Sequence, residues 1–346
     1  MQKKLTNGPL LDANGHLAQA GYATKLVAEY DRNAIKAKGI RIKEWDYYLI
    51  TSDDFAVALT MDDNSYMGMM SASIIEFGDN PWEKTTSKII PFTWGKVGLP
   101  SSSVTGDVVY KDKTCDFCFE NRPGYRRLKV TYKKFEGKED FTCDIKLTEE
   151  PEDSMVIATP FGKPKTHFYY NQKIVGMKAT GTATFKGKTY TFDESNNSYG
   201  MLDWGRGVWT YKNTWYWGAG HTKLPDGKVF GFNIGYGFGD TSAASENMIF
   251  YDGKAHKLEG VTFNIPQTAD GTDDFMSPWT FTSTDGRFEM QFKPIIDRAS
   301  LTEVGPIGSD QHQVFGKFTG KMVLDDGSVI ALDQFLGFAE KVRNKW

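Results

Sequence analysis

The segment Trp215-Tyr216-Trp217-Gly218-Ala219-Gly220-His221 is followed, after the turn sequence Leu224-Pro225-Asp226-Gly227, by Val229-Phe230-Gly231-Phe232-Asn233-Ile234-Gly235-Tyr236-Gly237-Phe238. Aromatic and β-branched residues on both sides of an Asp-Gly turn predict a β-hairpin. A loop of two or four residues would pair odd positions with even ones. One face would then hold the Trp, His and Phe side chains, and the other would be nearly bare.

The bare face would carry Tyr216 and Asn233 among glycines. Glycine at alternate strand positions weakens a strand unless another group must come close. One interpretation is a cavity floor with Asn233 as its polar group. The other is a face covered by a neighbouring segment, or a strongly bent barrel corner.

The rest of the chain has the same character and predicts a nearly all-β protein. Short apolar runs alternate with Gly, Asp, Asn and Pro, and Asp-Gly turns recur at positions 226, 252, 285 and 326. Many short strands with tight turns favour barrels or sandwiches. The expected strands are 44–50, 55–61, 66–77, 88–94, 107–111, 115–120, 128–135, 141–147, 175–185, 189–192, 214–222, 229–238, 248–251, 261–265, 279–282, 288–293, 313–323 and 329–342.

The chain is long for one core, since it has 346 residues. The acidic run 148–153 is the richest linker sequence. We therefore expect two domains: residues 1–165 as an N-terminal barrel with a loop-rich leader, and residues 166–346 as a C-terminal barrel carrying most of the site.

Charge and leader sequences restrict the function classes. The net charge of −3 gives no electrostatic basis for nucleic-acid binding. The first residues lack the apolar region of a secretion signal, and no stretch approaches a spanning helix of about 20 apolar residues. We expect a cytoplasmic protein without membrane insertion. The three cysteines, with the lone pair Cys115 and Cys118 on opposite strand faces, predict no metal site.

A second hairpin is expected within residues 312–342, around Asp325-Asp326-Gly327. A three-residue loop with Gly327 left-handed pairs even positions with even ones. In that register His312 lies opposite Glu340. A carboxylate can hold an imidazole in one tautomer for acid–base chemistry, and such a pair can equally pin a strand end.

The segment Tyr199-Gly200-Met201-Leu202-Asp203-Trp204-Gly205-Arg206-Gly207-Val208-Trp209 brings charged groups among tryptophans. Flanked by Leu202 and Trp204, the carboxyl group of Asp203 would be poorly solvated, which would raise its pKa and suit a general acid. Arg206 leaves an alternative open. If it reaches Asp203, the carboxyl group ionises and the pair becomes structural or clamps a substrate.

Glu246 begins a further strand and is a candidate second carboxylate. Its neighbour Asn247 would face the opposite way unless a bulge intervenes.

Several motifs together resemble bacterial domain-of-unknown-function family 2804. The resemblance spans nearly the whole chain and implies no established activity. Its motifs are Trp45-Asp46-Tyr47-Tyr48, Leu202-Asp203-Trp204-Gly205-Arg206-Gly207, Phe232-Asn233-Ile234-Gly235, Glu246-Asn247, His312-Gln313-Val314-Phe315-Gly316, Gly337-Phe338-Ala339-Glu340 and Trp346.

More distantly, Asp203-Trp204-Gly205 followed by Trp215-Tyr216-Trp217 is similar to the two-lipocalin-barrel group of carotenoid hydratases and tocopherol cyclases. In that group an aspartic acid protonates an isolated carbon–carbon double bond. The resemblance implies two lipocalin-like (calycin-type) antiparallel barrels packed together. It also implies Asp203 as the proton donor, with tryptophans shielding a carbocation. The match departs at Arg206.

We therefore expect an enzyme that uses a carboxylic acid to protonate a small, partly apolar substrate. A carbohydrate-active enzyme with paired carboxylates and a non-catalytic carrier of a hydrophobic ligand are the alternatives. We expect a small-molecule partner and no cofactor. The expected catalytic residues are Asp203, Glu246, His312 and Glu340. The expected ligand-binding residues are Trp204, Arg206, Trp209, Trp215, Trp217, His221, Asn233 and Asn247.

Overall fold

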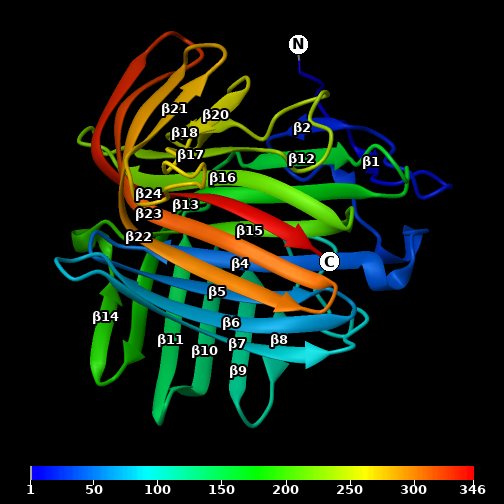
Figure 1. The fold of residues 1–346 in the computed structure, drawn as a ribbon, viewed down its shortest axis with the longest axis horizontal. Coiled ribbons are helices and arrows are strands. Elements are labelled where there is room, and N and C mark those ends of the chain that lie inside the picture. The colour runs from blue at the N-terminus through cyan, green and yellow to red at the C-terminus, as the bar shows by residue number, and fades with distance from the viewer. Residues whose placement is uncertain (1) are drawn as a thin grey trace.

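The computed structural model describes residues 2–346, and its regular structure is almost wholly antiparallel β (Figure 1). The strands form two large curled sheets, which confirms the all-β prediction. The remaining elements are a short parallel pair, β1 (Gly8–Pro9) with β3 (Ala28–Glu29), and the 3-10 helices η1 (Arg32–Ala34), η2 (Gly39–Arg41) and η3 (Glu194–Asn196).

The first sheet has 13 strands, and β13 is its branch point because it pairs with β15, β11, β12 and β14. In spatial order its main path is β7 (Trp82–Pro91), β6 (Met67–Glu76), β5 (Phe55–Asp63), β4 (Ile42–Thr51), β15 (Tyr199–Val208), β13 (Phe168–Phe185), β11 (Glu139–Thr148), β10 (Tyr125–Glu136), β9 (Cys115–Arg122) and β8 (Val108–Lys111). Beside this path lie β12 (Met155–Pro160), β2 (Gly21–Ala23) and β14 (Lys188–Phe192).

The second sheet has nine strands. Their spatial order is β19 (Lys254–Lys257), β18 (Met248–Tyr251), β17 (Val229–Tyr236), β16 (Lys212–Lys223), β24 (Val329–Lys345), β23 (Ile307–Val323), β22 (Phe288–Val304), β21 (Trp279–Ser283) and β20 (Val261–Asn264). The long strands β22, β23 and β24 extend from this sheet across β4, β5 and β6 of the first (Figure 1).

The chain passes from the first sheet to the second between Val208 and Lys212. Strands β13, β14 and β15 therefore belong to the first sheet, although they follow the domain division expected at residue 165. The stretch around Asp203 is part of the first barrel and faces the second.

The apolar side chains pack in three clusters. One fills the first barrel and includes Leu202, Trp204 and Val208. Another fills the second barrel around Phe232. The third lies between the barrels and includes Met201 and Trp209 as well as residues of β16, β23 and β24. The molecule thus has two interiors and one inter-barrel layer.

The hairpin between β16 and β17 has a different register from the expected one. Its three-residue loop, 225–227, ends at Gly227 with φ +84°, and the amide of Leu224 donates to the carbonyl of Lys228. A left-handed glycine permits this loop. Odd positions therefore pair with odd, so Trp217 lies opposite Gly235 and Ala219 opposite Asn233. The predicted bare face is wrong: each glycine sits beside a larger side chain.

The hairpin between β23 and β24 begins in the expected register, since Met322 lies opposite Ile330. A bulge between Phe318 and Gly320 then shifts the pairing by one residue. As a result His312 lies opposite Lys341, and Gln313 is the residue opposite Glu340. The predicted His312–Glu340 pair is wrong because the extra residue of a bulge exchanges the facing partners.

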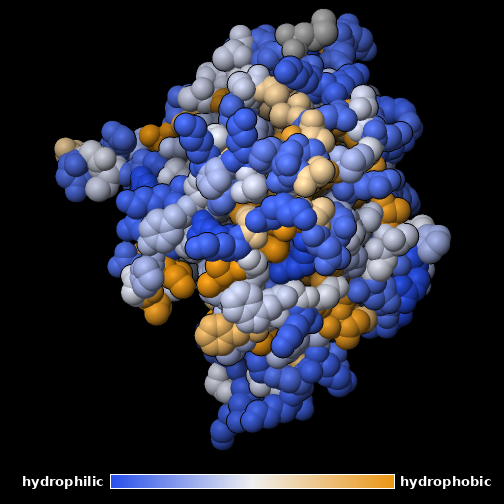
Figure 2. All heavy atoms as spheres, turned by 90° about the vertical axis from the view of Figure 1, so that its right-hand side faces the viewer, coloured by the Kyte–Doolittle hydropathy of each residue, from blue (hydrophilic) through white to orange (hydrophobic). Residues whose placement is uncertain are grey.

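The surface is mainly hydrophilic on the face shown in Figure 2, with apolar side chains in small groups across its middle. Within residues 2–346, no helix has the length and apolar character needed to cross a bilayer.

Candidate functional site

Strand β15 separates the two charged residues of the Asp203–Arg206 segment. Successive strand residues point to opposite faces, so residues three apart lie on different sides of the sheet. Trp204 belongs to the cluster inside the first barrel, whereas Met201 and Trp209 belong to the inter-barrel cluster. Asp203 therefore faces the second barrel, and Arg206 points away from it.

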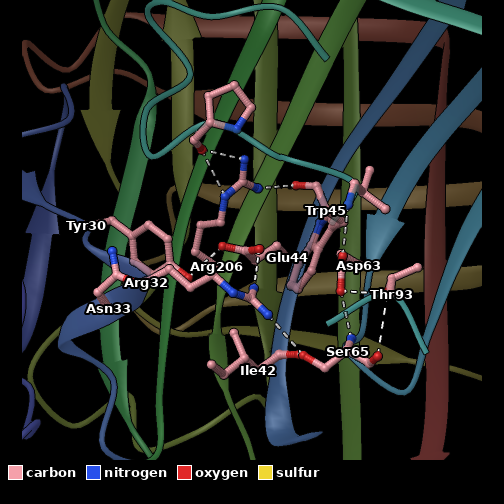
Figure 3. A network of polar contacts seen from close by, with 12 residues as sticks. Tyr30, Arg32, Asn33, Ile42, Glu44, Trp45, Asp63, Ser65, Thr93 and Arg206 are labelled. Atoms are coloured by element: carbon pink, nitrogen blue, oxygen red, sulfur yellow. Dashed lines mark hydrogen bonds and ion pairs between the residues drawn. The ribbon is translucent and has the colours of Figure 1, made fainter. Parts of the chain in front are cut away.

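Arg206 is completely buried and all five of its N–H groups are used. Figure 3 shows its contact with the backbone of Trp45. It pairs with the carboxylate of Asp46 at 2.9 Å and donates to the backbone carbonyls of Trp45, Gly205 and Pro100. Its guanidinium group stacks on the ring of Trp204, 4.3 Å from the centroid. Arg206 and Trp204 thus form a closed structural contact and do not reach the candidate site.

The first sheet contributes a row of three polar side chains that lie directly opposite one another. Asp203 on β15 pairs with Tyr47 on β4 and with Lys173 on β13. Asn171 lies two residues before Lys173 on β13. It donates from Nδ2 to Asp203 Oδ1 at 2.6 Å and to the carbonyl of Trp204 at 2.8 Å. Asn171 thereby fixes the orientation of the Asp203 carboxyl group.

The second sheet contributes a matching row across four strands. Trp217 lies opposite Glu340, Glu340 opposite Gln313, and Gln313 opposite Arg298. Gln313 donates to Glu340 Oε2 at 3.1 Å and accepts from Arg298 at 2.9 Å. The other oxygen of Glu340 accepts from the indole of Trp215 at 2.9 Å.

The two rows meet between the barrels. The amide group of Gln313 lies 3.4–3.5 Å from the hydroxyl of Tyr47. The amine of Lys173 lies 4.1 Å from the ring centroid of Trp217 and 2.8 Å from Glu246 Oε2. We call Asp203, Lys173, Glu246, Glu340, Tyr47, Tyr169, Asn171, Asn233, Gln313 and Trp217 the inter-barrel polar layer.

Glu246 is held in the layer by Asn233 and by a glycine. Asn233 donates from Nδ2 to the carbonyl and side chain of Glu246, and its Oδ1 accepts from the indole of Trp217 at 2.7 Å. A Cβ on Gly235 would lie 2.7 Å from Glu246 Oε1. Gly235 therefore gives the carboxylate room to approach β17 closely, which explains at least one glycine of this hairpin.

Three carboxyl groups in this layer share one nearby lysine, and two of them have raised pKa values. Burial raises the pKa of Asp203, although Lys173 and the hydrogen bond from Asn171 oppose the shift. Burial also raises the pKa of Glu340 to about 7, against the lowering effect of the Trp215 hydrogen bond. Burial and the negative charge of Asp203 raise the pKa of Tyr169 well above its usual range. Burial therefore favours the protonated form of Asp203, and Glu340 exchanges its proton close to neutral pH.

Aromatic rings surround these carboxyl groups. Trp45 stacks on Tyr169 at 5.9 Å between centroids, and Phe238 contacts Tyr169 and Trp215 edge-to-face at 4.8 and 5.2 Å. Trp45 and Trp215 are only half-buried, and 7% of Asp203 is exposed to solvent. Asp203 is therefore a nearly buried carboxyl group in an aromatic surround.

The structure brings six of the twelve predicted site residues into or against this layer: Asp203, Glu246, Glu340, Trp215, Trp217 and Asn233. The other six lie elsewhere. Besides Arg206 and Trp204, Trp209 packs against Trp45 in the inter-barrel cluster, beyond the polar layer. His221 lies near the end of β15, with Nε2 2.9 Å from the hydroxyl of Thr51, and burial lowers its pKa to about 4.

Asn247 and His312 have structural partners. Asn247 accepts from the amide of Gly235 and donates to the carbonyl of Glu259. His312 stacks on Phe275 at 3.9 Å and contacts Asp297 at 2.6 Å. Neither residue reaches Asp203.

Sequence reasoning missed Lys173, Asn171, Tyr47, Tyr169, Gln313 and Arg298. A signal was available for Lys173, because it is the only charged residue within 168–175, a run otherwise rich in aromatic and aliphatic residues. A single buried lysine in such a strand needs a partner. No comparable signal distinguished Gln313, since its place opposite Glu340 depends on the bulge in β23 and β24.

The described part of the chain contains no cluster of three or more His, Cys, Asp or Glu residues that could hold a metal ion. The three cysteines are free, and Cys115 and Cys143 are buried. Two open grooves, of about 460 and 830 Å³, lie on the outside of β10, β11 and β13 and beside the loops 224–226 and 324–331. Neither contains a residue of the inter-barrel polar layer.

Comparisons with known proteins agree with the fold and leave the activity open. Residues 2–346 match the sequence model of a family described as a domain of unknown function, DUF2804. No curated protein is significantly similar in sequence. A crystal structure assigned as AttH from Nitrosomonas europaea is similar over 96% of this chain and 98% of its own, with a TM-score of 0.56 and 12% identity.

Kievitone hydratase from Nectria haematococca is similar over 93% of this chain and 97% of its own, with a TM-score of 0.45 and 12% identity. The likeness to the AttH structure concerns the fold alone. Together with the two curled antiparallel sheets it confirms the predicted fold of two antiparallel barrels packed together.

Proposed function

The chain belongs to the DUF2804 family, and we propose that it is an enzyme that protonates a carbon–carbon double bond of a small, partly apolar molecule held between the two barrels. The proposal rests on the environment of the Asp203 carboxyl group. Asp203 is a buried carboxyl group with a raised pKa, set among aromatic rings, and the nearest lysine is already paired with Glu246.

Asp203 has the properties of a general acid. Its Oδ1 accepts a hydrogen bond from Asn171, which orients the carboxyl group. A carboxylic acid that stays protonated near neutral pH can transfer its proton in the rate-limiting step, and such catalysis contributes about 10²–10⁴-fold in rate. In the proposed step the O–H bond of Asp203 breaks, and the π electrons of the substrate form a C–H bond.

The resulting carbocation would be stabilised by the aromatic surround. Trp45, Tyr169, Trp215 and Trp217 carry electron-rich faces, which attract positive charge. Lys173 already lies over the Trp217 ring, so this ring accepts a cation in the resting protein. The cation would then lose a proton, as in isomerisation or cyclisation, or add water, as in hydration.

Glu340 is suited to the second proton transfer. Its pKa of about 7 lets it exchange a proton near neutral pH, and Trp215 and Gln313 hold its two oxygens. In the hydration branch the proton lost by the attacking water would pass to Glu340. The acid and the base would then come from different barrels, Asp203 from the first and Glu340 from the second.

Asp203→Asn tests the proposal because it keeps the size and the hydrogen bonds of the side chain and removes its proton. The wild type should incorporate deuterium from D₂O at carbon into an active member of a panel of partly apolar alkenes. Asp203→Asn should lower that turnover by about 100-fold or more and keep ligand binding. Asp297→Asn, a matched change outside the polar layer, should leave turnover unchanged.

An infrared measurement tests the proton directly and needs no substrate. At pH 7 the wild type should show the carbonyl band of a protonated carboxylic acid that is missing in Asp203→Asn. Equal spectra of the two proteins would overturn the assignment of Asp203 as the acid. Binding of an alkene by the wild type without deuterium incorporation would identify a carrier.

A further inference from the structure

A second unusual group in the inter-barrel region is the amine of Lys43. Lys43 lies on β4, on the same face as Trp45 and Tyr47, and is completely buried. Its Nζ has no hydrogen-bond partner. It lies 4.5 Å from the ring centroid of Tyr66, 4.7 Å from that of Trp346 and 5.6 Å from that of Trp209.

Unpaired polar atoms gather around this amine. Within residues 2–346, eleven buried side-chain nitrogen or oxygen atoms have no hydrogen-bond partner, and five belong to Lys43, Asp62, Tyr66, Trp209 and Trp346. We call these five residues the Lys43 cluster. A buried polar group without a hydrogen-bond partner destabilises a fold, so such groups are normally paired. Their concentration in one place indicates a site that a polar guest completes.

The charges of the cluster favour an uncharged amine beside a protonated acid. Burial, and next the positive charge of Arg41, lower the pKa of Lys43 to about 7. Burial raises the pKa of Asp62 to about 8, although Lys43 opposes this shift. Arg41 is itself held by the carbonyls of Trp209 and Trp346. A desolvated lysine next to another cation is the usual arrangement of an amine nucleophile.

Lys257 shows what a satisfied buried lysine looks like in the same chain. Burial likewise lowers its pKa to about 7. Its amine, however, donates to the hydroxyl of Ser245 and to the carbonyls of Asn247 and Leu258, at 2.7 to 3.0 Å. Lys257 therefore has a complete structural role, whereas the amine of Lys43 has its donors and its lone pair free.

We propose that the Lys43 cluster is a second small-molecule site, in which the free amine of Lys43 takes a flat aldehyde or ketone as an imine between the rings of Tyr66, Trp209 and Trp346. Tyr66 and Trp346 are only half-buried, so the cluster lies next to the protein surface. The unpaired indole N–H groups and the Tyr66 hydroxyl are donors for the oxygen atoms of the guest. The site does not depend on the chemistry proposed for Asp203.

The proposed reaction is balanced within the cluster. The amine nitrogen adds to the carbonyl carbon, and the carbonyl oxygen takes the proton of Asp62 to give a carbinolamine. The nitrogen then passes one proton to the hydroxyl as the C–O bond breaks, so that one water molecule leaves. The product is a protonated imine beside the carboxylate of Asp62. Asp62 has one oxygen free for this transfer.

Reductive trapping of the full chain tests the proposal. The protein is incubated at pH 7 with benzaldehyde and cyanoborohydride, and modified lysines are identified by mass spectrometry of peptides. An exposed amine with a pKa of about 10.4 is unprotonated in roughly one molecule in 2,500 at pH 7, against about half for Lys43. Lys43 should therefore be modified at least ~10-fold faster than exposed lysines, and Lys257 should not react.

Two variants separate the role of each group. Asp203→Asn should leave the trapping at Lys43 unchanged, because the two sites are independent. Asp62→Asn should slow trapping if Asp62 supplies the proton. Faster trapping in that variant would show that Asp62 acts only by its charge, and would overturn its role as the acid. An unmodified Lys43 under conditions that label exposed lysines would overturn the site and identify a caged ammonium group.

Discussion

The two faces of β15 carry two buried polar groups of opposite character. Toward the interior of the first barrel, Arg206 is paired with Asp46 and uses every N–H group. The same side holds Glu44, which accepts from Tyr30 and pairs with Arg32 (Figure 3). Toward the second barrel, Asp203 and two further carboxyl groups share a single lysine, and the pKa values of Asp203 and Glu340 are raised.

This difference distinguishes a structural network from a reactive one. Inside the first barrel Arg206 meets Asp46 and Glu44 meets Arg32, so removal of one partner leaves a buried charge unpaired. In the inter-barrel polar layer Lys173 pairs with Glu246, whereas burial raises the pKa values of Asp203 and Glu340. The first arrangement fixes the fold, and the second has the raised pKa values that the proposed proton transfer needs.

Replacement of Arg206 should have the largest effect on stability. Arg206→Met would leave the carboxylate of Asp46 and the carbonyl of Pro100 without partners. We expect a loss of about 3–5 kcal/mol in the free energy of unfolding, measured by denaturant titration. Adding Asp46→Asn should restore part of it. Asp203→Asn should change stability by less than about 1 kcal/mol at pH 7, and an equal loss in both variants would abolish the contrast.

The next largest effect should be the dependence of the free energy of unfolding on pH, to which Glu340 contributes. The pKa of Glu340 is raised from its ordinary value of 4.5 to about 7. A raised pKa gives a stabilising contribution that is complete below pH 4.5 and is lost as the pH rises toward 7. Between pH 5 and 8 this loss amounts to about 2–3 kcal/mol. Glu340→Gln should remove this part of the pH profile, as measured by denaturation at each pH; parallel profiles would contradict the assignment.

Substitution of two glycines of β15 by alanine should have the smallest effect on stability. The pair of variants tests how tightly each face of the strand is packed. A Cβ at Gly205 would lie 2.1 Å from the ring of Trp45, which is rigid. Gly205→Ala should therefore cost about 1–3 kcal/mol and disturb the wall of the candidate site. A Cβ at Gly200 would meet only the methyl groups of Leu147 inside the first barrel, at 2.7 Å. Gly200→Ala should be nearly neutral by thermal denaturation.

The sequence was sufficient for the fold because hydrophobic alternation and turn residues act locally. The Asp-Gly turns and the short apolar runs predicted most of the strands, but not β12 or β15. The two barrels were implied by the family resemblance. Register depended on finer features. The loop at 225–227 has three residues instead of two or four, and the bulge at Phe318 moved Gln313 into the place expected for His312.

The candidate site was predictable in part. Asp203 and Glu246 stood out by their neighbours. The position of Arg206 was left open because residues 199–208 were not expected to form a strand; once they do, residues 203 and 206 cannot share a face. Lys173 and Tyr47 could not be placed without the strand order β4-β15-β13, which brings residues 126 positions apart in sequence into one row. Long-range pairing of this kind leaves no local sequence signal.

The alternation along β15 has a consequence for how this chain can change. Neighbouring residues of the strand belong to different compartments, so a point substitution alters either the barrel interior or the layer between the barrels. The two compartments can therefore diverge separately. A one-residue insertion or deletion ahead of Asp203 would instead exchange their contents, turning the acid inward and the guanidinium outward. The number of residues in this strand is therefore more tightly constrained than the type of residue at each position.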